Sequence, residues 1–304
     1  MSNLRSSRRM THGHNSSIAV TLALQANGEV LLTDFTPTIG FIGSGRMATA
    51  LARGCVESGL INAHQVLAAD PSPDSRRAFA NDVPDVAVFD TNEQILARAD
   101  VVILAVKPQV MAAVLAEIKP LVSERHLFVS IAAGVPIARL AAGLPSGTRL
   151  VRVMPNTPCL VGLGASCFSR GATATESDAE HVRQILASVG QAFEVDEELL
   201  DAVTGLSGSG PAFIYRVIEL LAEGGAAMGL PAELALQLAA QTARGAAEMV
   251  LTTGRSPAEL REQVTSPGGT TLAGLNKLEE LKGAESFREA VIAATKRSQE
   301  LGRG

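Results

Sequence analysis

Thr38-Ile-Gly-Phe-Ile-Gly-Ser-Gly-Arg-Met-Ala48 is the stretch of sequence that decides the fold. Residues 38–42 have the short, apolar, β-branched pattern of a buried strand. Gly43, Gly45 and Ala48 follow at GxGxxA spacing, and a helical pattern begins there. The first glycine allows a tight turn, the second lets the backbone approach a pyrophosphate, and the small alanine lets the helix pack closely on the strand. The stretch therefore predicts a dinucleotide-binding turn between a strand and a helix.

Strand and helix patterns alternate from this turn to about residue 196. The amphipathic stretches between the apolar runs are long enough to cross back over a sheet. The alternation predicts an α/β fold with an N-terminal Rossmann-type, doubly wound parallel sheet. The expected strands are 38–42, 66–69, 86–89, 101–106, 127–131 and 150–153, and the helices between them include 47–58, 74–81 and 109–118.

Beyond about Glu197 the strand pattern stops and alanine-rich helical patterns replace it. Prolines stand where these helices should begin and glycines where they should end. Small residues at 222 and 224–227 would let another helix, from this chain or a second subunit, approach closely. We therefore expect an all-α C-terminal half. Its expected helices are 211–228, 231–251, 257–264, 270–281 and 286–300.

Composition limits the possible partners. Hydrophobic residues make up 46% of the 304-residue chain, yet no apolar run approaches the ~20 residues of a membrane span. A net charge of −5 with scattered basic residues gives no footprint for nucleic acid. The three cysteines lack the spacing of a disulfide framework or a zinc site, so we expect no metal and a reducing, cytoplasmic location. The expected partner is a small molecule.

Residues 1–35 do not share the pattern of the rest of the chain. Three arginines precede a short apolar run at 18–24, which faintly resembles a targeting peptide but lacks a clear cleavage site. An extension or an upstream start fits better than a signal. We expect residues 1–35 to be an N-terminal extension without fixed structure, 36–196 a dinucleotide-binding Rossmann-type domain, and 197–304 a helical domain.

Further candidate residues come directly after the expected strands. Asp70 ends the second strand, where an acid favours the free ribose 2′-hydroxyl of NAD(H). Ser72 and the arginines at 76–77 could instead hold a 2′-phosphate, so NADPH and NADH both stay open. Lys107 and Pro108 end the fourth strand, at the edge where ligands of such sheets bind. The small residues of Ser130-Ile-Ala-Ala-Gly134 would let a nicotinamide ring lie close.

Two glycine-rich segments in the C-terminal half each precede an expected helix. They are Gly205-Leu-Ser-Gly-Ser-Gly-Pro211 and Ser266-Pro-Gly-Gly-Thr-Thr271. Free backbone N–H groups at a helix start bind anions well, although either segment could simply cap its helix. Together they predict a carboxylate-binding site.

The sequence from Thr38 to about Glu300 resembles the pyrroline-5-carboxylate reductase family. The resemblance rests on residues 40–45, 105–108 and 130–134, on Arg152-Val-Met-Pro-Asn-Thr-Pro158, and above all on 202–212 and 264–271. It implies hydride transfer from NADPH or NADH to the imine carbon of 1-pyrroline-5-carboxylate, giving L-proline. It also implies a homodimer or higher homo-oligomer formed through the helical dimerisation domain. No metal is implied.

Site residues carried over from the family form two groups, and Thr271 is the implied catalytic residue, hydrogen-bonded to the ring nitrogen of the substrate. Asp70 stands where many members carry a small hydroxyl residue, so strict NADPH preference does not follow. The residues implied to contact the cofactor are Ile42, Gly43, Ser44, Gly45, Arg46, Met47, Asn92, Ala105, Val106, Lys107, Pro108 and Ala133. The position after the second strand adds Asp70 and Ser72 to this group. The implied substrate group is Glu197, Gln263, Ser266, Gly268, Gly269, Thr270 and Thr271.

The sequence leaves two other functions open. A β-hydroxyacid dehydrogenase shares this organisation but relies on a lysine in its helical half, where Lys277, Lys282 and Lys296 all lie outside the glycine-rich segments. A non-catalytic dinucleotide-binding regulator would need only the first half.

Overall fold

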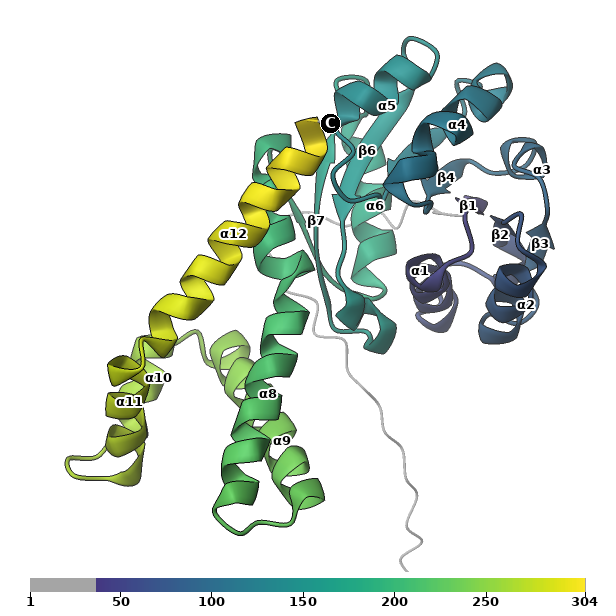
Figure 1. Cartoon of the computed structure of the whole chain (residues 1–304). Helices are drawn as coiled ribbons and strands as arrows, with labels where there is room; N and C mark the ends of the chain where they lie inside the picture. Colours follow the sequence, from purple (N-terminus) through teal and green to yellow (C-terminus); the bar gives the residue numbers. More distant parts are fainter. Residues whose placement is uncertain (1–36, 304) are drawn as a thin grey trace, which may run out of the picture. The chain divides into compact units, whose positions relative to one another are not determined.

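The apolar runs of the first half form one sheet of eight strands in a computed structural model that describes residues 37–303 (Figure 1). The strand order is β3-β2-β1-β4-β5-β6-β7-β8. The first six strands are parallel and have the order of a Rossmann fold, with the topological switch between β1 and β4. These strands are β1 (Ile39–Ile42), β2 (Val66–Ala69), β3 (Ala87–Phe89), β4 (Val101–Leu104), β5 (Leu127–Ser130) and β6 (Arg149–Met154).

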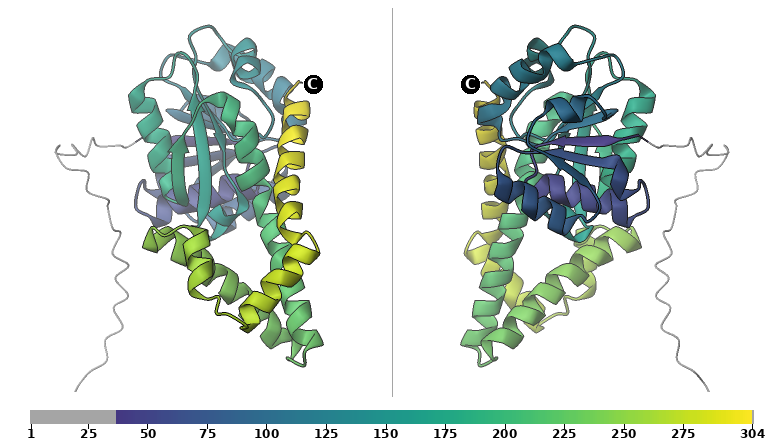
Figure 2. Two further views of the ribbon diagram at one scale, coloured as in Figure 1. Left: turned by 90° about the vertical axis from the view of Figure 1, so that its left-hand side faces the viewer. Right: turned by 90° about the vertical axis from the view of Figure 1, so that its right-hand side faces the viewer.

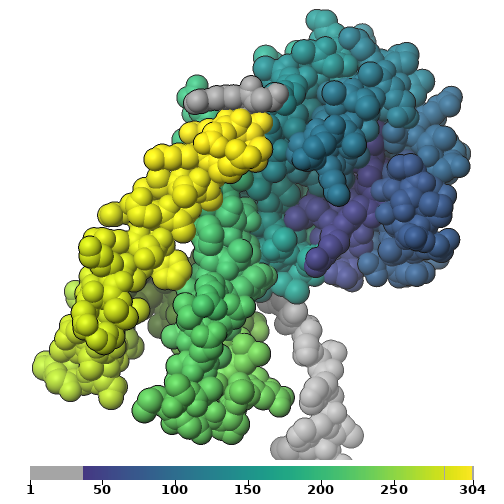
Figure 3. Space-filling view, viewed as in Figure 1, coloured from purple at the N-terminus to yellow at the C-terminus, as the bar shows by residue number. Residues whose placement is uncertain are grey.

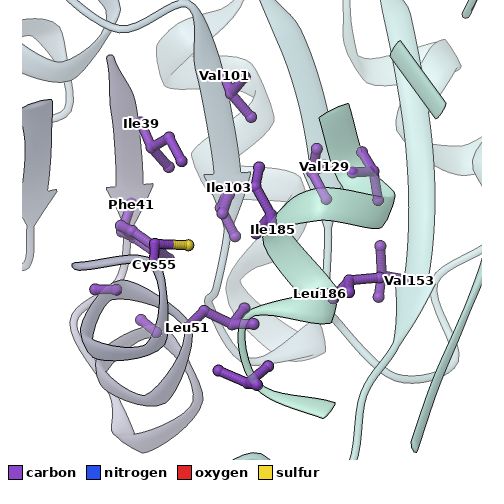
Figure 4. Packing of buried hydrophobic residues seen from close by; sticks show 14 of the residues in the cluster. Ile39, Phe41, Leu51, Cys55, Val101, Ile103, Val129, Val153, Ile185 and Leu186 are labelled. Carbon is purple, nitrogen blue, oxygen red and sulfur yellow. The ribbon is translucent and has the colours of Figure 1, made fainter. Parts of the chain in front are cut away.

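Helices cover both faces of this sheet (Figures 1 and 2). Because successive strand residues point to opposite faces, Phe41 and Ile103 join a core with α1, α2 and α6, whereas Ile42 and Leu104 join one with α3, α4 and α5. Figure 4 shows the first core around Phe41, Leu51 and Ile185. The helices are α1 (Arg46–Glu57), α2 (Pro73–Asp82), α3 (Glu93–Leu96), α4 (Pro108–Ile118), α5 (Ile137–Gly143) and α6 (Glu176–Ala187). The predicted α/β fold is confirmed.

Two strands were not predicted. β7 (Gly164–Arg170) runs antiparallel to β6, and β8 (Gly190–Glu194) runs parallel to β7 at the edge of the sheet. Gly164 and Gly190 let these strands meet, because a Cβ on Gly190 would overlap the Gly164 backbone. The sheet therefore extends beyond the parallel strands that the sequence indicated.

All secondary structure in the described residues from Leu200 onward is helical. They are α7 (Leu200–Val203), α8 (Gly210–Ala227), α9 (Ala232–Thr253), α10 (Pro257–Gln263), α11 (Thr270–Glu280) and α12 (Gly283–Arg303). Each predicted helix is present, with ends within three residues of the prediction. Gly229 and Gly254 follow α8 and α9 with φ of +99° and +66°, as glycines after helices commonly do.

The glycine-rich segment at 205–211, predicted to precede a helix, is itself largely helical. Residues Thr204–Gly208 form a π-helical turn that joins α7 to α8, and the Ser209 N–H donates to the Thr204 carbonyl at 2.9 Å. A Cβ on Gly205 would overlap the Thr295 side chain of α12 and lie 2.8 Å from the Val291 carbonyl. The glycines here allow close helix packing.

No helix in residues 37–303 combines the length and apolar character needed to cross a bilayer. The predicted extension at 1–35 lies outside the described residues.

Candidate active site

The glycine-rich turn lies at the carboxyl ends of β1 and β4. Gly43 has φ of +96°, and a Cβ there would lie 2.8 Å from the Ala105 carbonyl, so only glycine fits. Gly45 has no heavy atom within 4 Å of the position a Cβ would take, and it precedes α1. The turn thus presents bare backbone at a helix start.

This turn fits a dinucleotide pyrophosphate. The N-terminus of α1 has no side-chain cap and no acidic residue in its first turn, so its N–H groups and positive dipole end are free for an anion. The Ser44 hydroxyl is buried without a hydrogen-bond partner among the described residues. A buried hydroxyl without a partner costs free energy, and a phosphate oxygen would satisfy it.

Asp70 comes directly after β2 and lies beside this turn. Its carboxylate accepts hydrogen bonds from the Ser44 N–H at 3.0 Å and the Ser72 N–H at 2.9 Å. Arg76 donates to the Asp70 and Pro71 carbonyls at 2.7 and 3.1 Å. The Ser72 hydroxyl caps α2 by accepting from Ser75. The acid and the arginine therefore both brace the β2–α2 turn.

The other predicted cofactor residues lie at the same carboxyl edge. Ile42 ends β1, and the Ala105 N–H donates to its carbonyl at 2.8 Å. Lys107 is exposed and precedes α4, which begins at Pro108. Asn92 stands between β3 and α3, where its side chain donates to Glu117 at 3.0 Å. Ala133 is exposed in the turn after β5, and Arg46, Met47 and Val106 flank the glycine-rich turn and the end of β4.

The second glycine-rich segment, 266–271, forms a turn at the start of a helix. Gly268 has φ of +72°, and the Gly269 N–H donates to the Ser266 carbonyl at 3.0 Å. This turn leads directly into α11, whose first residues are Thr270, which is exposed, and Thr271, which is half-buried. Gln263 ends α10. The α11 N-terminus has no side-chain cap, so its first N–H groups are available.

Glu197 has a different setting from the other predicted substrate residues. Its Oε1 accepts from the Ile137 N–H at 2.7 Å and from the Arg152 guanidinium at 3.0 Å. Arg152, which the site prediction omitted, is buried on β6, and its charge within the apolar run 150–153 was the available signal. Glu197 also lines a cavity of about 600 Å³ with Arg170 and Glu194.

The described part of the chain keeps the two predicted groups on separate elements. The glycine-rich turn lies at the edge of the sheet, and the 266–271 loop lies at the start of α11. No hydrogen bond within residues 37–303 joins them. Nor do these residues contain a cluster of three or more metal-ligating side chains.

Comparison with known families agrees with both halves. The family model for NADP oxidoreductase, coenzyme F420-dependent, matches residues 38–134. The model for pyrroline-5-carboxylate reductase dimerisation matches residues 197–301. Fold and site together define an oxidoreductase with a Rossmann-type dinucleotide-binding half.

Individual relatives narrow this class. Pyrroline-5-carboxylate reductases of Arabidopsis thaliana and Pisum sativum are 48% and 44% identical, with 86% and 87% of this chain and 95% and 96% of theirs covered. The chain belongs to the pyrroline-5-carboxylate reductase family. Solved relatives include the Coxiella burnetii enzyme, with 36% identity, a TM-score of 0.82 and coverage of 87% and 98%. A Plasmodium falciparum pyrroline carboxylate reductase with NADP bound has 33% identity, a TM-score of 0.79 and coverage of 88% and 98%.

Proposed function

We propose that this chain reduces 1-pyrroline-5-carboxylate to L-proline with NADPH or NADH, the last step of proline biosynthesis. The observation that carries the proposal is the glycine-rich turn at the β1–β4 switch point, with its uncapped helix start and unpartnered Ser44 hydroxyl, in a chain of this family. Its resident cofactor, when bound, supplies the hydride.

The residues of the chain bind the coenzyme and the substrate and orient them for hydride transfer. The glycine-rich turn and the α1 N-terminus hold the pyrophosphate, and the edge from Ala105 to Pro108 with Ala133 receives the nicotinamide half. The N–H groups of the 266–271 loop hold the substrate carboxylate. The Thr271 hydroxyl donates a hydrogen bond to the ring nitrogen, whose basicity rises as the imine becomes an amine. Binding at the carboxylate thus fixes the imine carbon for attack.

We also propose that two copies associate through the helical half. α8, green in the space-filling view of Figure 3, buries none of its residues within the described chain, although Ile214, Leu220 and Leu221 are large and apolar. An exposed apolar surface of this extent is typical of an interface. The proposed domains are 36–196 and 197–304, because β8 ends at Glu194 and the later elements of the described residues are all helices. Three free thiols, at Cys55, Cys159 and Cys167, support the proposed cytoplasmic location.

The test is a steady-state assay of the purified full chain. NADPH and NADH should each be oxidised in the presence of 1-pyrroline-5-carboxylate, with L-proline as product. Oxidation of NADPH or NADH by an oxoacid instead, or reduction of NADP+ or NAD+ by a 3-hydroxyacid, would indicate a hydroxyacid dehydrogenase. Coenzyme binding without turnover on any of these would indicate a regulator.

A further inference from the structure

Glu197 connects the helical half to the turn that comes after β5. Its Oε1 lies 2.7 Å from the backbone nitrogen of Ile137, the first residue of α5. Only Val135 and Pro136 separate this residue from Gly134, which is buried and has φ of +72°. The turn at 131–136 includes Ala133, the proposed nicotinamide contact. The Glu197 carboxylate therefore holds the far end of the nicotinamide turn.

A cluster of charges around the buried Arg152 fixes Glu197 in turn. The Arg152 side chain is 7% exposed, and its two terminal nitrogens lie 3.0 Å from Glu197 and 4.0 Å from Asp201. Asp201 accepts a hydrogen bond at 2.6 Å from Ser298, a buried residue of α12. A charge-assisted hydrogen bond in such a setting is short and directional. The cluster joins β6, α7 and α12 to the start of α5.

The end of α12 touches the same turn from another side. A Cβ on Gly134 would lie 3.5 Å from the Leu301 Cβ, and Arg139 of α5 donates to the Gly302 carbonyl at 3.4 Å. Figures 1 and 2 show this end of α12 beside α5. Two contacts from the helical half thus meet at the nicotinamide turn.

From these contacts we propose that Glu197 is a positioning residue for hydride transfer, acting through the Ile137 N–H on the nicotinamide turn. The proposal rests on the proposed function and adds to the role that the family resemblance implied for Glu197. Its Oε1 is shared between a backbone N–H and a guanidinium, which fixes the carboxylate in place.

Substitution of Ile137 tests the hydrogen bond directly. Ile137→Pro deletes the N–H donor, and proline suits the first position of a helix, where the preceding Pro136 with ψ of 153° is already extended. Ile137→Ala is the matched control, because it removes the side chain and keeps the donor. Glu197→Ala removes the acceptor, and Glu198→Ala removes the adjacent exposed carboxylate.

For each variant and the wild type, coenzyme fluorescence gives the Kd for NADPH in the absence of substrate. Steady-state kinetics give kcat and the KM for the substrate. Ile137→Pro and Glu197→Ala should each weaken NADPH binding and lower kcat about tenfold, as expected for a lost charge-assisted hydrogen bond, with little change in the KM for the substrate in Ile137→Pro. Their double variant should lose no more than either alone. Both controls should match the wild type.

Other results would overturn the proposal. A raised substrate KM in Glu197→Ala, with unchanged NADPH binding and an Ile137→Pro that matches Ile137→Ala, would make Glu197 a substrate contact only. Equal losses in Ile137→Pro and Ile137→Ala would mean that the hydrogen bond plays no part. A wild type that binds NADPH but does not reduce 1-pyrroline-5-carboxylate would refute the proposed function, while the NADPH Kd would still test the hydrogen bond.

Discussion

Thr271 is the residue on which the proposed mechanism most depends. It is half-buried at the second position of α11, and its neighbour Thr270 is exposed. Thr271→Ala should lower kcat by about one to three decades, because a hydrogen bond that strengthens in the transition state is worth roughly 1.5 to 4 kcal/mol. NADPH affinity should not change. Steady-state kinetics check this, with Thr270→Ala as the control.

The two threonines distinguish three outcomes. Wild-type turnover in Thr271→Ala and a loss in Thr270→Ala would assign the hydroxyl role to Thr270. Full activity in both variants would exclude a threonine hydroxyl from the mechanism.

Asp70 should affect the choice of coenzyme. Its carboxylate lies on the Ser44 N–H, so its negative charge lies beside the nucleotide turn and should disfavour a 2′-phosphate. Asp70→Ser should shift the ratio of kcat/KM values for NADPH and NADH toward NADPH. Asp82→Ser, which replaces an exposed acid at the end of α2, is the control for a general effect of charge. An unchanged ratio in Asp70→Ser would show that Asp70 does not face the ribose.

At the scale of elements, the π-helical turn between α7 and α8 depends on a glycine. Gly205→Ala would place a methyl group against Thr295 and the Val291 carbonyl, and overpacking of this kind costs about 1–3 kcal/mol of unfolding free energy. Gly210→Ala is the matched control, since nothing lies within 4 Å of its Cβ position. Urea denaturation of both variants checks this. Equal midpoints would show that α12 moves aside easily.

Local sequence signals predicted most elements because each has a local physical cause. Periodicity and punctuation by proline and glycine indicated the parallel strands and the long helices, as in Thr38–Ile42 with its glycine-rich turn. β7 and β8 were not predicted, because serine, cysteine and glycine interrupt their apolar pattern, as in Gly164-Ala-Ser-Cys-Phe. The helical form of 205–211 was not predicted, because glycine occurs both in loops and in close helix contacts. The Arg152 cluster depends on residues far apart in the chain, which no local pattern reports.

The whole molecule should associate through its helical half. Leu221 on α8 is 53% exposed, although it is a large apolar residue. Leu221→Glu should convert the wild-type dimer or larger assembly to smaller species, because burial of an unpaired charge is costly. Light scattering after size exclusion measures this. Arg216→Ala, on the charged side of the same helix, should keep the wild-type mass, and an unchanged mass in Leu221→Glu would place the interface elsewhere.

Unfolding of the whole chain should depend on pH through His126. This residue is 1% exposed, accepts from the Ser123 N–H at 3.0 Å and lies 2.9 Å from the Leu96 carbonyl. Burial lowers its pKa below the usual 6.5, so the folded chain resists a proton that the unfolded chain takes up. The unfolding free energy should therefore fall as the pH drops below about 6.5.

His126→Gln should make the fall in unfolding free energy smaller between pH 8 and pH 5. His181, whose pKa burial also lowers, should account for part of what remains. Urea midpoints across this range measure the difference, and an unchanged slope would mean that His126 takes up its proton equally in both states.

The two outer strands of the sheet have a consequence for aggregation. β3 has only three residues, and β8 has five, with Glu194 held by Arg170 and Arg183. Short, charged edge strands are poor templates for the addition of a strand from another molecule. At the high concentrations used for crystallisation or storage, this sheet should therefore not seed fibrils, and self-association should stay confined to the helices.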